Sequence, residues 1–139
     1  MDLAPGSSVG RYRVEEKVGS GGFGDVYRAT DPVLNRTVAL KVIRARDGET
    51  ASRFKDSLTE ARTASALNHP SIVTIHDVDE HDGKPFIVME WIEGVSLREL
   101  MTGEPASPQR VADYGKQIAS ALLRAHEEGI VHRDLKPEN

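Results

Sequence analysis

The feature that most restricts the fold is a glycine-rich segment near the start of the chain, where residues 19–26 read Gly-Ser-Gly-Gly-Phe-Gly-Asp-Val. Glycines let a backbone approach phosphate oxygens closely, so that its N–H groups can bind them. A dinucleotide-binding loop of the pattern G-x-G-x-x-G opens directly into a helix. Here residues 26–29 lead instead into the turn at Asp31-Pro32. We therefore expect the segment to join two antiparallel strands and cover phosphates as a flap, although a plain glycine-rich hairpin also fits the segment taken alone.

The spacing of apolar residues changes along the chain and predicts an α+β fold. Strand-like runs occur at residues 11–18, 26–29, 37–43, 72–78 and 85–91, with a hairpin turn expected at Asp82-Gly83. An apolar stripe with helical spacing covers residues 51–67, and a short helical piece follows at 96–101. A longer helix is expected after Ser107-Pro108 and should end before Gly129. This order predicts an antiparallel five-stranded sheet with one inserted helix, followed by helices.

Composition excludes several kinds of protein and partner. The 139 residues carry a formal net charge of −4, so we expect no nucleic-acid partner. Without cysteine there are no disulfides and no thiolate metal sites. Residues 1–10 lack the basic start and apolar stretch of a secretory signal, and no apolar run approaches the roughly 18 residues that span a bilayer. We expect a cytoplasmic protein, and the sequence leaves open a membrane anchor beyond Asn139.

A lysine lies inside the most apolar strand-like run, where residues 38–41 read Val-Ala-Leu-Lys. An unpaired buried ammonium group is costly, so Lys41 needs a counter-charge or an anionic ligand. Glu60, on the helix predicted over residues 51–67, is placed to pair with it. Taken singly, Lys41 has the ordinary interpretation of an edge-strand lysine, and Glu60 that of a solvated helix charge. Together with the glycine-rich segment, the two residues indicate a phosphate-binding site.

The final ten residues, Ile-Val-His-Arg-Asp-Leu-Lys-Pro-Glu-Asn, concentrate reactive side chains. Transfer of a phosphoryl group to a hydroxyl requires a carboxylate to orient the hydroxyl, a cation at the γ-phosphate and oxygen ligands for Mg²⁺. Asp134, Lys136 and Asn139 supply these chemical groups within one short loop. An ordinary polar surface loop offers no reason for this combination.

Four motifs in this order resemble those of eukaryotic-type Ser/Thr protein kinases, most closely the bacterial ones. They are the glycine-rich segment, the Val-Ala-Leu-Lys lysine, the helix glutamate and the His-Arg-Asp-Leu-Lys-Pro-Glu-Asn segment. The resemblance implies that Lys41 holds the α- and β-phosphates of ATP and pairs with Glu60. It implies that Asp134 orients the acceptor hydroxyl, Lys136 neutralises the γ-phosphate and Asn139 ligates Mg²⁺. Lysine two residues after the aspartate is the Ser/Thr pattern.

The resemblance also implies how the nucleotide is enclosed. The loop N–H groups would cover the phosphates, Met89 would be the gatekeeper, and the backbone of Glu90 and Ile92 would meet the adenine edge. The full set expected at the nucleotide is Val18, Gly19, Ser20, Gly21, Gly22, Phe23, Gly24, Val26, Ala39, Lys41, Met89, Glu90 and Ile92.

A bilobal kinase fold implies three regions in this sequence. Residues 1–10 would be a flexible lead-in, residues 11–94 the N-lobe and hinge, and residues 95–139 the start of the helical C-lobe through the catalytic loop. The family's D-F-G segment, which holds the main Mg²⁺ ions, is not reached before Asn139. We therefore expect the 139-residue chain by itself to be inactive, while the protein that contains it phosphorylates Ser and Thr hydroxyls of proteins.

Two other functions are compatible with this fold. A pseudokinase would bind nucleotide or a partner without catalysis, but the intact Lys41, Asp134 and Asn139 argue against it. A small-molecule kinase, such as an aminoglycoside kinase, shares the fold, but the His-Arg-Asp-Leu-Lys-Pro-Glu-Asn segment favours protein substrates. A panel of protein and small-molecule substrates separates a protein kinase from a small-molecule kinase.

Overall fold

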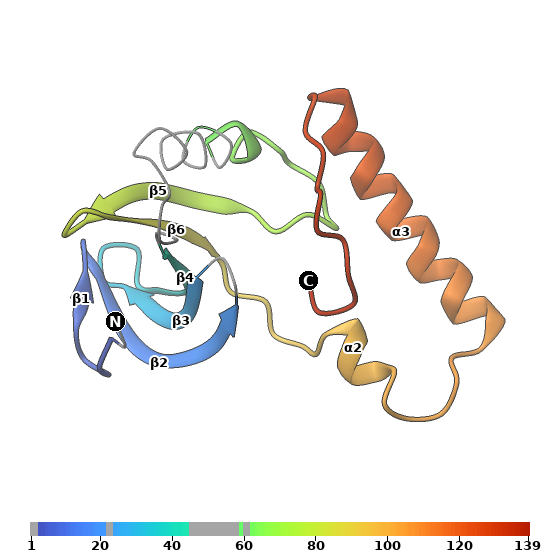
Figure 1. Cartoon of the computed structure of the whole chain (residues 1–139), viewed down its shortest axis with the longest axis horizontal. Helices are drawn as coiled ribbons and strands as arrows, with labels where there is room; N and C mark the ends of the chain where they lie inside the picture. Colours follow the sequence, from blue (N-terminus) through green and yellow to red (C-terminus); the bar gives the residue numbers. More distant parts are fainter. Residues whose placement is uncertain (1–2, 22–23, 45–58, 60–61) are drawn as a thin grey trace. The chain divides into compact units, whose positions relative to one another are not determined.

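The chain forms two units, which are described separately. The computed structural model describes residues 3–21, 24–44, 59 and 62–139. Unit 1 comprises Met1–Ala66 and Thr74–Ile92, and unit 2 comprises Leu67–Val73 and Glu93–Asn139. Unit 1 contains the strands, and unit 2 contains the two helices that Figure 1 labels.

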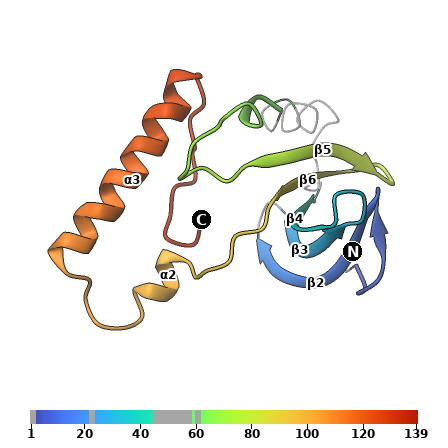
Figure 2. The ribbon, with the colours of Figure 1, turned by 180° about the vertical axis from the view of Figure 1, so that it is seen from behind.

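Unit 1 is built on one antiparallel sheet. In chain order its strands are β1 (Ser8–Val9), β2 (Tyr12–Gly21), β3 (Gly24–Asp31), β4 (Arg36–Ile43), β5 (Ile75–His81) and β6 (Lys84–Glu90). They lie in the order β1-β2-β3-β4-β6-β5. Figure 1 labels the strands, and Figure 2 shows the ribbon from behind. The predicted antiparallel sheet is confirmed, with six strands rather than five among the described residues.

The additional strand lies in the segment that was expected to be a flexible lead-in. Ser8 pairs with Arg13 and Val9 with Tyr12, so the chain folds back on itself at Gly10, whose φ is +54°. Val9 is 3% exposed and packs into the core. The sequence does not predict this strand, because one buried valine after the Pro-Gly-Ser-Ser stretch of residues 5–8 is too short a pattern to reveal it.

The core occupies one face of the sheet. Its buried members are Val9, Tyr12, Val14, Tyr27, Ala29, Val38, Leu40, Phe86 and Val88. Residues two apart on a strand share a face, and antiparallel register places Tyr27 beside Leu40 and Leu40 beside Val88. Each large side chain buried in this way contributes about 1.5–3 kcal/mol.

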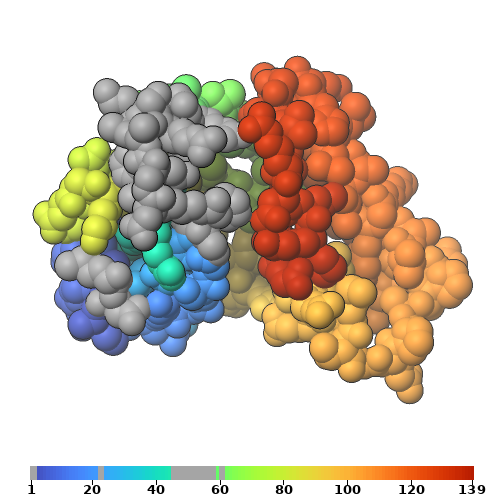
Figure 3. Space-filling model, viewed as in Figure 1, coloured from blue at the N-terminus to red at the C-terminus, as the bar shows by residue number. Residues whose placement is uncertain are grey.

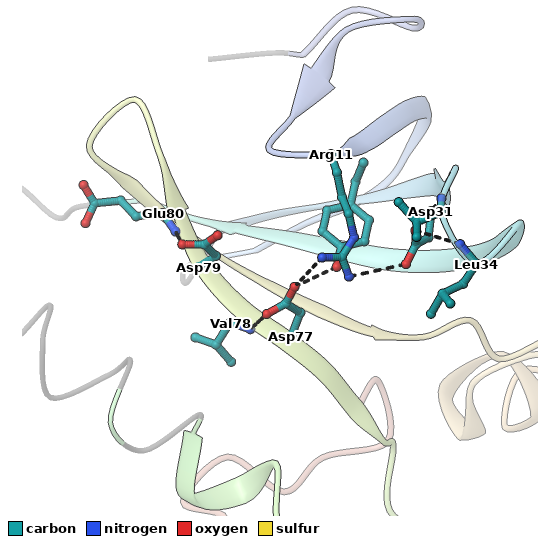
Figure 4. A network of polar contacts seen from close by, with 9 residues as sticks. Arg11, Asp31, Leu34, Asp77, Val78, Asp79 and Glu80 are labelled. Carbon is teal, nitrogen blue, oxygen red and sulfur yellow. Dashed lines mark hydrogen bonds and ion pairs between the residues drawn. The ribbon is translucent and has the colours of Figure 1, made fainter.

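A polar network joins three parts of the sheet that are distant in sequence (Figure 4). Arg11 lies 3.5 Å from both Asp31 and Asp77, measured from guanidinium nitrogen to carboxylate oxygen. The hydroxyl of Tyr12 donates to Asp77 at 2.9 Å. The Asp31 carboxylate also accepts from the backbone N–H groups of Val33 and Leu34, which fixes the predicted turn after β3. The network therefore fastens the start of β2 to the end of β3 and to β5.

Several turns and connections can be compared with the sequence. Asp82 and Gly83 have φ values of +50° and +70° between β5 and β6, which confirms the predicted hairpin turn. The predicted strand over residues 72–78 begins only at Ile75, because the N–H of Ile72 is used in a turn that donates to the carbonyl of His69. Most of the predicted helix over residues 51–67 lies outside the described residues, and residues 59 and 62–64 are helical.

Unit 2 contains α2 (Leu97–Leu100) and α3 (Pro108–Glu127). Ser96 and Glu99 form a capping box at α2, and Ser107 caps α3 with Pro108 at its first position. After α3, Gly129 has φ +75°, its N–H donates to His126 and the next N–H donates to Ala125. This pattern confirms the predicted glycine end of the helix. Among the described residues, neither helix combines the length and apolarity required to cross a membrane.

Candidate active site

The glycine-rich segment forms the turn between two antiparallel strands. Gly19 pairs with Val26, Ser20 with Asp25 and Gly21 with Gly24, while Gly22 and Phe23 at the tip lie outside the described residues. No helix follows the segment, since β3 begins at Gly24. The prediction of a strand–loop–strand arrangement is therefore confirmed, and the dinucleotide-binding alternative is excluded.

Gly24 is required for a reason that the sequence did not reveal. Its φ is +149°, and a Cβ atom added there would lie 2.1 Å from the carbonyl oxygen of Val42 on β4. At Gly21 an added Cβ would meet nothing within 4 Å. Gly24 therefore permits the close approach of β3 and β4, independently of any phosphate.

Four of the residues expected at the nucleotide lie on one face of the sheet. Val26 pairs with Lys41, and Ala39 pairs with Met89. Ala39 and Lys41 are two residues apart on β4, so all four side chains share a face. The core residues Tyr27, Leu40 and Val88 alternate with them and therefore occupy the opposite face. The four residues are partly buried, as expected for side chains that line a binding surface.

The other residues expected to contact the nucleotide in unit 1 differ in their exposure and in their position on the strands. Val18 lies at an irregularity of β2 between Lys17 and Gly19, and it is 46% exposed. Glu90 ends β6, where its carboxylate accepts from the N–H of Thr74 at 2.6 Å and its own N–H donates to the Thr74 carbonyl. Ile92 is 58% exposed in the irregular segment that follows. Glu60, the expected partner of Lys41, lies outside the described residues.

The three catalytic-loop residues lie together in unit 2. The Nζ atom of Lys136 is 2.9 Å from Oδ2 of Asp134. The side-chain Nδ2 of Asn139 donates to the Asp134 carbonyl at 2.6 Å and to its Oδ2 at 3.1 Å. The Asn139 N–H donates to the Lys136 carbonyl at 3.0 Å, which closes the turn. In Figure 3 this last segment, in red, is uncovered on the visible face of unit 2.

This geometry gives each group a defined chemical state. Hydrogen bonds from Lys136 and then Asn139 hold the pKa of Asp134 below its ordinary value, so Asp134 is an anion at neutral pH. Its side chain is 43% exposed, and the side chain of Lys136 is 46% exposed, so both can meet a substrate. Asn139 donates through its nitrogen to Asp134, and an amide oxygen can ligate a cation.

The oxygen ligands that the described residues offer fit an Mg²⁺ ion that is bound mainly through the phosphates of its substrate. The described residues contain no cluster of three or more His, Cys, Asp or Glu side chains that would form a protein cage for a metal ion. Mg²⁺ is commonly bound through one or two protein oxygens together with substrate phosphates and water. The oxygen of Asn139 matches such a site.

The catalytic loop is held by two features that sequence reasoning missed. Arg133 has φ +62°, a conformation that costs a non-glycine residue of order 1–3 kcal/mol, and the next N–H donates to the His132 carbonyl at 2.9 Å. From α2, the N–H of Arg98 donates to the Pro137 carbonyl at 3.0 Å, and its guanidinium lies 3.6 Å from Glu138. A charged residue on a four-residue helix carries no sequence signal for such a contact.

Comparison with known proteins agrees with this arrangement. The protein kinase domain family matches residues 12–139, nearly the whole chain. The chain belongs to the protein kinase domain family. It is 44% identical to the serine/threonine-protein kinase PrkC of Bacillus subtilis over 134 residues, which cover 94% of this chain and 20% of that protein. It is 45% identical to the serine/threonine-protein kinase pkn2 of Myxococcus xanthus over 143 residues, covering 99% and 17% respectively.

Solved structures confirm the kinase fold. A crystal structure of the PknI kinase domain of Mycobacterium tuberculosis has a TM-score of 0.87 and 30% sequence identity, covering 99% of this chain and 56% of that kinase domain. This kinase chain spans about a fifth of the length of the curated relatives, with 20% of PrkC and 17% of pkn2 covered. The family as a whole uses ATP and Mg²⁺.

Proposed function

We propose that this chain forms the nucleotide-binding and catalytic-loop part of a kinase that transfers the γ-phosphoryl group of ATP to Ser or Thr hydroxyls of proteins. The observation that carries the proposal is the contact of Asp134 with Lys136 and Asn139 in an exposed loop. It brings an anion, a cation and a neutral oxygen ligand together where a substrate can reach them. Protein substrates and a cytoplasmic location of the catalytic domain are parts of the same proposal.

Each group has a separate task in this reaction. The Asp134 carboxylate accepts a hydrogen bond from the acceptor hydroxyl and receives its proton as the new O–P bond forms and the bond to the β-phosphate oxygen breaks. Lys136 neutralises charge on the γ-phosphate. Asn139 holds Mg²⁺, which when bound neutralises phosphate charge.

The face of the sheet opposite the core binds the rest of ATP in this proposal. Val26, Ala39 and Met89 contact the adenine, and Lys41 binds the α- and β-phosphates. The support is their shared face, given by the pairing of Val26 with Lys41 and of Ala39 with Met89. The glycine-rich hairpin supplies backbone N–H groups to the phosphates.

The test is phosphoryl transfer from radiolabelled ATP by the full-length protein that contains this sequence. We expect phosphoserine and phosphothreonine on protein substrates and no transfer to an aminoglycoside. Lys41→Met should abolish transfer, whereas Lys84→Met, which removes an exposed lysine from β6, should not. Nucleotide binding without transfer would support the pseudokinase alternative, and transfer to the aminoglycoside alone would support the small-molecule kinase.

A further inference from the structure

A buried carboxylate lies directly behind the glycine-rich hairpin. Asp25 follows Gly24 on β3 and is 4% exposed. It is two residues from Tyr27, a core residue, so its side chain is on the core face of the sheet. Val26 and Lys41 occupy the opposite face. Asp25 is therefore separated by the sheet itself from the surface proposed to bind adenine.

Two cations and a hydroxyl surround Asp25. Arg44 binds both carboxylate oxygens, with Nε to Oδ2 at 3.0 Å and Nη2 to Oδ1 at 2.5 Å. Lys17 Nζ lies 2.9 Å from Oδ1. Nη2 of Arg44 also donates to the Ser20 hydroxyl at 2.7 Å. The hydrogen bonds from Arg44 outweigh the effect of burial and hold the pKa of Asp25 far below its ordinary value.

Lys17, Ser20 and Arg44 lie at positions from which they can fix the orientation of the hairpin. Lys17 and Ser20 are on β2, on either side of the irregularity that contains Val18. Arg44 directly follows β4, three residues after Lys41. A two-point contact between an arginine and a carboxylate fixes orientation as well as distance. Asp25 therefore links the glycine-bearing end of β2 to the end of the strand that carries Lys41.

We propose that Asp25 is a positioning residue that, through Arg44, Lys17 and Ser20, holds the glycine-rich hairpin in its phosphate-binding conformation relative to Lys41. This proposal rests on the function proposed above. Fixing the backbone of glycine residues around a ligand costs conformational entropy. A network that restricts the hairpin beforehand lowers that cost for ligands that the hairpin binds.

The proposal makes a prediction that a purely structural role does not. In this proposal the N–H groups of the hairpin contact only phosphates, while Val26 contacts the adenine from β3, so disturbing the hairpin should weaken ATP and ADP binding much more than adenosine binding. In the full-length protein, we expect Asp25→Asn to raise the Kd for ATP and ADP about tenfold and to leave that for adenosine within about twofold. Titration calorimetry measures all three constants.

Two further variants keep the test decisive. Arg44→Gln changes a side chain that is 49% exposed, so it tests the network even where Asp25→Asn does not fold. It should give the same selective loss, and the double variant should be little worse than either single variant, because both remove one interaction. Glu16→Gln is the matched control, since it breaks a 3.8 Å ion pair to Arg28 between β2 and β3 without touching β4.

Each outcome bears on one proposal or both. Selective loss of ATP and ADP affinity supports the positioning role. Equal losses of affinity for ATP and adenosine, or no loss of ATP affinity for Arg44→Gln, overturn the positioning role. The proposed function stands in that case if the unaltered protein binds ATP and transfers its phosphoryl group. Failure of the unaltered protein to bind ATP overturns the proposed function, and the positioning role with it.

Discussion

Two aspartates show how differently the two units use a carboxylate. Asp31 in unit 1 is fully buried at the end of β3, while Asp134 in unit 2 has 43% of its side chain exposed. Both have a lowered pKa. For Asp31, burial by itself would raise the pKa, but backbone N–H donors and Arg11 overcome it. For Asp134, Lys136 and Asn139 lower the pKa with little burial to oppose them.

The difference indicates where each charge has its effect. The Asp31 carboxylate is buried, its Oδ1 accepts from the turn N–H groups and its Oδ2 lies 3.5 Å from Arg11, so it holds the fold and is out of reach of a substrate. An exposed carboxylate held by neighbours within five residues adds little stability, because exposed ion pairs contribute little. Removing the first should therefore destabilise the fold, and removing the second should stop the chemistry.

The largest expected effect is that of Asp134→Asn on catalysis. We expect kcat of the full-length protein to fall about a thousandfold, as for loss of a positioned proton acceptor, with the unfolding temperature nearly unchanged. Initial-rate assays and thermal unfolding measure the two quantities. Asp113→Asn, an exposed position on α3, is the control. A large fall in unfolding temperature for Asp134→Asn would break the comparison.

Next in size is the effect of Asp31→Ala on stability. The variant loses two hydrogen bonds to the turn and leaves Arg11 without a partner at that position, so we expect about 3 kcal/mol of destabilisation, roughly a hundredfold in the folding equilibrium. Asp79→Ala, exposed on β5, should cost less than about 0.5 kcal/mol. Denaturant titration measures both.

The lowered pKa of Asp31 adds a dependence on pH. Since its folded-state pKa lies below the ordinary value of 3.8, its stabilising contribution is complete above that value and is lost as the pH falls below it. The acid limb of the stability profile should therefore become shallower in Asp31→Ala. An unchanged acid limb would show that Asp31 does not carry the stabilisation assigned to it.

The smallest expected effect is that of Tyr12→Phe on stability, which tests the polar network of the sheet from its tyrosine. Burial and the hydrogen bond to Asp77 raise the pKa of Tyr12 to about 12. Its stabilising contribution is therefore complete below pH 10 and is lost as the pH rises toward 12. Tyr12→Phe should cost about 1 kcal/mol at neutral pH and reduce the alkaline loss of stability. Tyr114→Phe on α3 is the control at neutral pH, and an equal cost there would contradict the role given to Tyr12.

Local signals predicted much of the fold and of the candidate site. The capping residues Ser96 and Ser107, the helix-ending Gly129 and the Asp82-Gly83 turn all act within a few residues of themselves, so the sequence was sufficient to place them. The catalytic loop was predictable for the same reason, since its three residues contact one another within five positions. The β1 strand was missed because its pairing depends on a single buried valine.

Long-range packing decided what the sequence could not. The contact of Tyr12 with Asp77 spans 65 residues, and that of Arg44 with Asp25 spans 19. Neither has a periodicity or motif of its own, because register between strands is set by the sheet as a whole. Gly24 shows the same limit: its motif suggested phosphate binding, whereas the passage of β4 within 2.1 Å of its missing Cβ decides that no other residue fits. The sequence by itself determined the reactive groups and five of the strands along the chain, and the tertiary structure determined the position of each strand in the sheet, which face each group occupies and which charges are buried.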